Sequence, residues 1–303
     1  TTGSRVRKAP IPGSELANVH YLRNITDVEA IRSGLTPGSN LVIVGAGYIG
    51  LEVAAIAKKG GLNVTVLEMA ERPLQRAVAP ELSDFYTKLH TDAGVDLRCN
   101  VRIESFSGST AVTGVNLKGA APLPADIVII GIGILPNTEL AEAAGLTIDN
   151  GIAVDEFCRT EDPSILSAGD CTSHPNRLLG RRLRLESVHN ALEQAKTVAC
   201  TICGEPVEYA QIPWFWSDQY DIKLQIVGLS EGYDTVILRG EPASKHFAAF
   251  YLKGNKLLSV DAINSAREFM LAKKLLAKGA ELDVEQLKDM SIPFKDIATA
   301  ALA

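Results

Sequence analysis

The segment Val42-Ile43-Val44-Gly45-Ala46-Gly47-Tyr48-Ile49-Gly50 carries three glycines in the pattern Gly-x-Gly-x-x-Gly. An apolar run precedes the first glycine, an Ala-rich helical pattern covers 48–59, and a second apolar run covers 63–67. This context is typical of a dinucleotide-binding βαβ unit. We expect Gly45 to permit the tight turn, Gly47 to let the backbone approach a pyrophosphate, and Gly50 to let the helix pack closely on the sheet.

The residue that closes the second apolar run discriminates between cofactors. Glu68 can accept hydrogen bonds from a ribose 2′-hydroxyl and would repel a 2′-phosphate, so NADH is predicted over NADPH. Tyr48 and Ile49 begin the helix, whose N-terminal amides favour phosphate. FAD and NAD share this fingerprint, and the pattern alone leaves both open.

The alternation of apolar runs and helical patterns predicts an α/β fold with a parallel sheet. Helices are expected at 80–93, 187–203 and 264–278, and another after a capping box at Thr26. The predicted strands are 95–99, 125–130, 152–154, 165–168, 223–227, 235–239, 247–251 and 256–260, with antiparallel strands within 103–117 and a basic loop at 177–184.

Composition fits several packed domains and excludes some partners. The chain has 303 residues, 46% hydrophobic and 22% charged, with a net charge of −6. Two or three domains are expected, and neither nucleic acid nor membrane is an expected partner. The apolar run at 125–135 is too short to cross a bilayer, and no export signal opens the chain, so a cytoplasmic location is the default. Five scattered cysteines form no disulfide framework, and no metal site is expected; Cys200 and Cys203 read as small apolar residues at a helix end.

Three further segments carry a resemblance to a known family. Ile165-Leu166-Ser167-Ala168-Gly169-Asp170 resembles the second flavin-contacting motif of two-dinucleotide-binding, glutathione-reductase-like flavoprotein reductases, in which a short strand presents the Asp. Together with Leu-Glu-Ser-Val-His-Asn-Ala at 185–191 and Trp-Phe-Trp-Ser-Asp-Gln-Tyr-Asp at 214–221, the chain resembles the bacterial FAD-dependent NADH:ferredoxin reductases of oxygenase systems.

The resemblance covers essentially the whole chain and implies its domain order. It implies that 1–15 ends a first FAD-domain segment whose own glycine fingerprint is missing here. The expected order continues with an NAD-binding domain at 16–148, a second FAD-domain segment at 149–212 and a C-terminal α+β interface domain at 213–303. The glycines from 45 to 50 then form the family's second fingerprint, the one for NAD.

The resemblance also implies roles for individual residues. No protein side chain is expected to react, because flavin and nicotinamide carry the chemistry; Glu52, Glu186 and Trp216 are expected to support them. The residues that it implies for FAD are Thr2, Gly3, Arg23, Asp170, Val188 and Trp216. Those for NAD are Gly45, Gly47, Tyr48, Ile49, Gly50, Glu52, Glu68, Arg76, Gly133 and Glu186.

The implied activity is hydride transfer from NADH to FAD and then single-electron transfer to a small, acidic [2Fe–2S] ferredoxin that supplies a cytochrome P450 or Rieske oxygenase. Such encounters are transient and steered by charge. Candidate docking charges are Arg177, Arg181, Arg182, Arg184, Lys273, Lys274 and Lys278. Two alternatives remain open: another pyridine-nucleotide flavoprotein, such as an NADH oxidase or disulfide reductase, and an NADH-sensing signalling flavoprotein.

Overall fold

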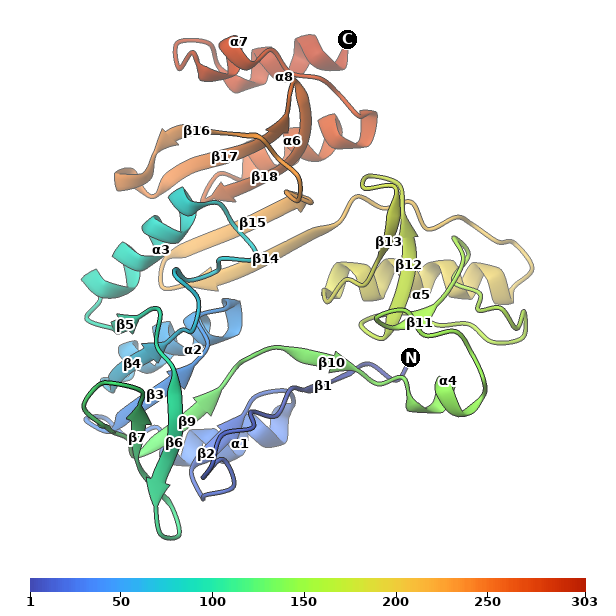
Figure 1. The fold of residues 1–303 in the computed structure, drawn as a ribbon. Helices are drawn as coiled ribbons and strands as arrows, with labels where there is room; N and C mark the ends of the chain where they lie inside the picture. Colours follow the sequence, from blue (N-terminus) through green and yellow to red (C-terminus); the bar gives the residue numbers. More distant parts are fainter. The chain divides into compact units, whose positions relative to one another are not determined.

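A computed structural model describes all residues, Thr1–Ala303 (Figure 1). The chain divides into two compact units. The parallel-sheet unit comprises Val6–Ile134 and the hairpin turn Ser217–Ile222. The composite unit comprises Thr1–Arg5, Leu135–Trp216 and Lys223–Ala303. Each unit is described by itself, and the four-segment domain order expected from the sequence stays a prediction.

The parallel-sheet unit is built on five parallel strands in the order β2-β9-β3-β4-β5. This is the parallel α/β arrangement predicted from the sequence. Its strands are β2 (Val19–Tyr21), β3 (Asn40–Val44), β4 (Asn63–Leu67), β5 (Asp96–Arg98) and β9 (Ile127–Ile130). Its helices are α1 (Ile25–Gly34), α2 (Tyr48–Lys59) and α3 (Pro80–Asp92). The helix predicted at 48–59 is confirmed at both ends.

The core of this unit follows from the apolar runs. Four consecutive residues of β9, from Ile127 to Ile130, are buried, as a strand covered on both faces requires. The small residues Ala54, Ala55 and Ala57 of α2 are also buried. An antiparallel meander of β6 (Ile103–Gly108), β7 (Val112–Leu117) and β8 (Leu123–Pro124) adds Phe106 and Val115 to a cluster with sheet residues, which confirms the antiparallel prediction.

The cap of α1 differs from the sequence prediction. Asn24, not Thr26, is the N-cap: its side chain accepts from Asp27 N at 3.0 Å, and Asp27 Oδ2 accepts from Asn24 N at 3.0 Å. The capping box therefore exists, two residues earlier than predicted. Asn24 has an acid three residues later that can bond back to its amide, and its backbone is extended, as an N-cap requires.

The first part of the composite unit is a small sheet with one long helix. Its elements are β1 (Ser4–Val6), β10 (Ile134–Pro136), α4 (Glu139–Ala143), β11 (Ile152–Ala153), β12 (Thr172–Asn176), β13 (Arg181–Leu183) and α5 (Val188–Ile202). β1 pairs with β10, and the other strands form a sheet in the order β11-β12-β13. Ser187 caps α5 by accepting from Asn190 N, so the predicted helix is confirmed within one residue at each end.

Two predictions in this part are wrong. Residues 165–168 are not a strand: they make one isolated bridge, Arg159 with Leu166, and the strand begins at Thr172, after the Asp. Around that bridge Ser167 N donates to Cys158 O, and a turn bond from Thr172 N to Gly169 O follows. Residues 177–184 are not wholly loop, because β13 pairs with β12.

The C-terminal part of the composite unit is an antiparallel sheet packed against helices, in the order β14-β15-β18-β17-β16; residues Ser217–Ile222, which end β14 and begin β15, are the hairpin turn that counts with the parallel-sheet unit. Its elements are β14 (Trp214–Gln219), β15 (Ile222–Gly228), β16 (Thr235–Glu241), the 3-10 turn Pro242–Ser244, β17 (His246–Lys253), β18 (Lys256–Ile263), α6 (Ala266–Lys278), α7 (Val284–Lys288) and α8 (Phe294–Leu302). The four predicted strands and the predicted helix are confirmed; β14, α7 and α8 were not predicted.

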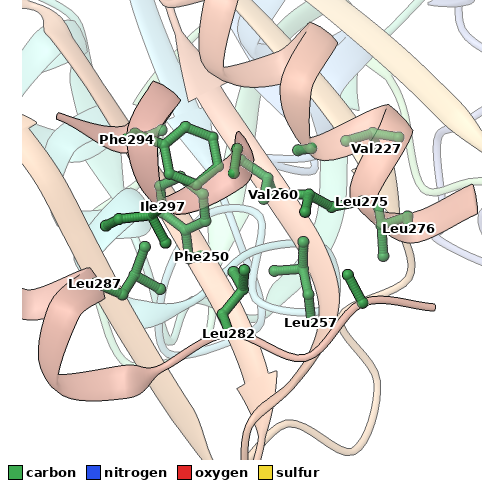
Figure 2. Packing of buried hydrophobic residues seen from close by; sticks show 14 of the residues in the cluster. Val227, Phe250, Leu257, Val260, Leu275, Leu276, Leu282, Leu287, Phe294 and Ile297 are labelled. Carbon is green, nitrogen blue, oxygen red and sulfur yellow. The ribbon is translucent and has the colours of Figure 1, made fainter. Parts of the chain in front are cut away.

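One apolar cluster joins this sheet to its helices. Figure 2 shows Phe250 and Val260 of the sheet against Leu275 of α6 and Phe294 of α8. The rings of Phe250 and Phe294 lie 4.6 Å apart, and such aromatic pairs add to area burial. None of the helices in either unit combines the length and hydropathy that crossing a bilayer would require.

Candidate functional site

The glycine loop between β3 and α2 has two glycines that the chain itself requires and one that leaves open space. A Cβ on Gly45 would lie 2.4 Å from Gly131 O, and one on Gly50 would lie 2.1 Å from Gly45 O. A Cβ on Gly47 would meet nothing within 4 Å. Gly47 is exposed at the start of α2, whose first-turn amides receive no side-chain cap. The loop thus presents an uncapped helix N-terminus and free space beside it, which suits a pyrophosphate.

Glu68 is held against this loop by its carboxylate. Its Oε2 accepts from Ala46 N at 2.7 Å, and its Oε1 accepts from Ala70 N at 2.8 Å. These bonds fix the carboxylate at the carboxyl end of β4, beside the glycine loop. A carboxylate has about four acceptor positions, so it retains acceptor capacity for a ribose hydroxyl.

Two more of the residues assigned to NAD, Gly133 and Arg76, lie in segments that contact the same loop. Gly133 has φ +100° in the turn after β9, where Gly131 N donates to Val44 O at 2.8 Å. Arg76 is exposed and follows Leu74, whose N donates to Ala46 O at 3.0 Å. The structure therefore gathers the glycine loop, Glu68, the Gly133 turn and the Arg76 segment at the carboxyl ends of neighbouring strands.

Glu52 lies on α2, one turn beyond Tyr48, and its carboxylate has a specific partner. Ser217 Oγ donates to Glu52 Oε1 at 2.6 Å. Burial raises the pKa of Glu52 and the charge of Asp218 adds to that rise, whereas hydrogen bonds from Ser217 and from the backbone of Asp218 oppose it. Sequence reasoning missed Ser217 as a partner because the two residues are 165 positions apart.

In the composite unit, Asp170 is fixed by residues from three segments. Ser4 Oγ donates to Asp170 Oδ2 at 2.9 Å, which places the Thr2–Gly3 segment beside it. Gly169 N donates to Gln194 Oε1 of α5 at 2.7 Å. Arg184 Nη1 reaches Asp170 O at 3.3 Å. The role of Gln194 in holding this turn was not predicted from the sequence.

The N-terminal turn of α5 begins with Val188, which was assigned to FAD, and follows Glu186, which was assigned to NAD and to support of the rings. Val188 is 57% exposed, so its side chain is available for contact. Glu186 pairs with Arg184. The ring of His189 lies 5.4 Å from that of Trp214, and Trp214 lies 5.5 Å from Trp216. The composite unit thus brings Asp170, Glu186, Val188 and the Trp214–Trp216 pair to the start of one helix.

Arg23 and three of the four candidate docking arginines are not gathered at these sites, whereas the fourth, Arg184, contacts Asp170 O and Glu186. Arg23 belongs to the parallel-sheet unit, between β2 and α1, and its assignment to FAD stays a prediction. The four candidate docking arginines make contacts within the protein: Arg177 with Glu208, Arg181 with Glu231, Arg182 with Val154 O and Ser173 O, and Arg184 with Glu186.

The residues present fit both dinucleotides. The open space at Gly47 suits the close approach of a pyrophosphate, and Glu68 suits ribose hydroxyls. Asp170 offers carboxylate oxygens to the hydroxyls of a ribityl chain, and exposed Val188 offers an apolar contact for a flat ring. The cysteines at the end of α5 show no partner pair for redox chemistry here: Cys200 lies within the helix and Cys203 is its exposed C-cap.

Comparison with known proteins identifies the family of the chain. Residues 1–195 match the pyridine nucleotide-disulphide oxidoreductase model, and residues 214–298 match the reductase C-terminal model. Putidaredoxin reductase of Pseudomonas putida is 46% identical over 308 residues, covering 100% of this chain and 73% of that protein. Rhodocoxin reductase of Rhodococcus erythropolis is 42% identical, covering 97% of this chain and 69% of that protein.

The solved structures agree with the sequences. The putidaredoxin reductase–putidaredoxin covalent complex matches with a TM-score of 0.96 and 46% identity, over 99% of this chain and 74% of that one. A ferredoxin reductase from Rhodopseudomonas palustris matches with a TM-score of 0.94 and 40% identity, over 98% and 74%. On these matches, which take in both units, the chain belongs to the pyridine nucleotide-disulphide oxidoreductase family and, within it, to the group of the bacterial ferredoxin reductases.

Proposed function

We propose that the protein is an FAD-dependent NADH:ferredoxin oxidoreductase that supplies electrons to an oxygenase system. The observation that carries this proposal is the likeness, over nearly the whole chain, to putidaredoxin reductase, rhodocoxin reductase and a ferredoxin reductase. When bound, FAD accepts a hydride from NADH and can release the two electrons one at a time. The location we propose is the cytoplasm, since the cysteines are unpaired and few.

The chain's own residues bind and orient. The glycine loop would hold the NADH pyrophosphate through the α2 amides, and Glu68 would accept from the adenosine ribose, with Tyr48, Ile49, Arg76 and Gly133 beside it. Asp170 would accept from the ribityl hydroxyls, with Thr2, Gly3, Arg23 and Val188 around FAD. Glu52, Glu186 and Trp216 would support the nicotinamide and flavin rings. No side chain is asked to form a covalent bond.

The proposed acceptor is a small acidic [2Fe–2S] protein that docks through positive charge. Because Arg177, Arg181 and Arg184 are ion-paired with carboxylates of this chain and Arg182 donates to backbone oxygens, Lys273 and Lys274 of α6 become the stronger docking candidates. Lys273 Nζ lies 5.8 Å from the centroid of the Trp214 ring, which lies 5.5 Å from Trp216, the tryptophan assigned to the flavin. Charge here would mainly raise the association rate.

The experiment that tests the function is steady-state NADH oxidation by the FAD-loaded holoenzyme with three acceptors in parallel. We expect fast turnover with a [2Fe–2S] ferredoxin, slow turnover with oxygen, and none with a disulfide. Turnover with ferredoxin should fall as salt rises, because the encounter is electrostatic. Rapid disulfide reduction without ferredoxin reduction would replace this proposal with the disulfide reductase alternative.

Replacing Glu68 with Ala should erode the preference for NADH. The loss of the ribose acceptor should lower kcat/KM for NADH about tenfold, while NADPH, which carries a phosphate in that place, should lose less or gain. The measurement is the ratio of kcat/KM for the two cofactors, with Glu71→Ala, three residues on and exposed, as the control. An unchanged ratio would show that Glu68 does not contact the ribose.

A further inference from the structure

A chain of buried polar groups runs from Glu52 into the body of the parallel-sheet unit. Ser217 Oγ donates to Glu52 Oε1 at 2.6 Å, and Gln219 Nε2 donates to Ser217 Oγ at 3.1 Å. Gln219 Oε1 lies 2.8 Å from His90 Nε2 of α3, and the other ring nitrogen, His90 Nδ1, lies 3.2 Å from Tyr220 Oη. All five residues belong to this one unit.

The burial of these groups makes the chain energetically important. Ser217 and Gln219 are each 1% exposed, and His90 is fully buried. A buried polar group that loses its partner costs about 1–3 kcal/mol, so each member depends on the next. Because α2, α3 and the hairpin turn each contribute residues, the chain also ties three separate segments together.

The chemistry of the groups allows one direction for the protons. An ionised carboxylate only accepts hydrogen bonds, so the Ser217 hydroxyl donates to Glu52. The same hydroxyl oxygen accepts from the amide of Gln219. The amide oxygen of Gln219 must then accept from His90 Nε2–H. A neutral imidazole protonated on Nε2 has an acceptor at Nδ1, which fits the hydroxyl of Tyr220.

We infer that His90, Gln219 and Ser217 are positioning residues that hold the ionised carboxylate of Glu52 in one orientation in the nicotinamide-side part of the NADH site. This inference rests on the proposed function for the place of Glu52. The chain orients rather than conducts, because the amide of Gln219 does not pass protons on as a hydroxyl or imidazole does. Burial lowers the pKa of His90, which keeps the ring neutral, as the chain requires.

The hydrogen-bonded chain is also connected, through β14, to a tryptophan assigned to the flavin. Ser217 directly follows Trp216 in β14, and Ser217 and Gln219 alternate with Trp216 and Asp218 along the strand. A change that frees Ser217 would therefore loosen both the carboxylate on α2 and the strand that carries the tryptophan assigned to the flavin.

A double-mutant cycle with Ser217→Ala and Glu52→Gln tests whether Ser217 acts through Glu52. Ser217→Ala should lower kcat/KM for NADH about tenfold, the effect of losing one hydrogen bond to a charged group, and should move the acidic limb of its pH profile upward. In the Glu52→Gln background, Ser217→Ala should change kcat/KM by less than about twofold. Ser33→Ala, on the exposed face of α1, is the matched control.

Nitrogen-15 NMR of the histidine side chains gives a readout that needs no turnover. In the wild-type holoenzyme, the signals that disappear in His90→Gln should show a neutral ring protonated on Nε2 from pH 6 to 8. In Ser217→Ala the amide of Gln219 can turn over, so a population protonated on Nδ1 should appear.

The outcomes separate the inference from the function. Additive effects of Ser217→Ala and Glu52→Gln, or a His90 tautomer that Ser217→Ala leaves unchanged, would overturn the positioning role of these residues. NADH turnover by the wild type would still support the proposed reductase function. A wild type that does not oxidise NADH would overturn the proposed function. The tautomer shift of His90 in Ser217→Ala would still test whether the hydrogen-bonded chain from Glu52 to His90 exists. If Ser217→Ala fails to fold, Ser217→Thr, which keeps the hydroxyl, should retain the wild-type tautomer; loss of that tautomer would count against the chain.

Discussion

Replacing Gly47 with Val should abolish NADH binding while leaving the parallel-sheet unit folded. Gly47 has φ −79° and ψ −178°, an extended conformation open to any residue, and a Cβ there would meet nothing within 4 Å. The new side chain would instead fill the space proposed for the pyrophosphate. We expect the Kd for NADH to rise at least about 100-fold, or about 2.8 kcal/mol, with Tm changed by less than about 2 °C.

The matched comparison is Gly50→Ala, a substitution three residues further along the same loop that is expected to act by a different mechanism. Its Cβ would lie 2.1 Å from Gly45 O, so the loop itself must shift. Binding and Tm should therefore fall together. NADH titration and thermal unfolding, measured on both variants, test whether binding and Tm change separately in one and together in the other. Tight NADH binding by Gly47→Val would show that the pyrophosphate does not lie against this loop.

Replacing Asp261 with Asn should stabilise the C-terminal part of the composite unit at alkaline pH. Asp261 lies in β18 between β15 and β17, is 1% exposed, and its Oδ2 accepts from Tyr251 Oη at 2.6 Å. Burial raises the pKa of Asp261 from 3.8 to about 7, and the bond from Tyr251 opposes that rise. The folded protein therefore retains this proton well above the pH at which the unfolded chain releases it.

The sign of the pH dependence follows from that difference. Between about pH 4 and pH 7 the unfolded chain binds fewer protons here, so the wild type loses stability as pH rises. At 1.36 kcal/mol for each pKa unit, the loss is roughly 4 kcal/mol above pH 7. Asn cannot ionise and can still accept from Tyr251, so the variant should avoid this loss.

Denaturant unfolding of the holoenzyme at pH 5 and pH 8 measures the effect. The advantage of Asp261→Asn in free energy of unfolding should widen by roughly 3 kcal/mol from pH 5 to pH 8. Asp296→Asn, on the exposed side of α8, is the control and should show no such change. A difference between variant and wild type that is the same at both pH values would mean that Asp261 is ionised in the folded protein.

Local patterns explain what the sequence could predict. The bounds of α2 were predictable because Gly47 precedes the helix, Gly60 follows it, and Ala-rich spacing fills it. The glycine loop and Glu68 were predictable because motif, strand and acid lie within one βαβ unit. The cap at Asn24 was missed because Asn24 and Thr26 are both good N-cap residues, and only the backbone distinguishes them.

The failures involve contacts between distant segments. The apolar run at 165–168 looked like a strand, but its backbone bonds go to Cys158 and neighbouring turns. No sequence pattern around Glu52 indicates that Ser217 is its partner. None around Asp170 indicates Ser4, which is 166 residues away. Helix α8 did carry an apolar pattern, with Phe294, Ile297 and Ala298 buried, so a closer reading of its period could have found it.

The double attachment of Glu68 limits how this protein could change its cofactor. The same carboxylate that would select NADH also ties down Ala46 of the glycine loop and Ala70 beyond β4. An evolutionary switch to NADPH at this position would have to discard both ties at once. A protein that made this switch would need compensating substitutions in the glycine loop. A single substitution should therefore rarely change the preference from NADH to NADPH, and directed evolution should obtain the change only through several substitutions together.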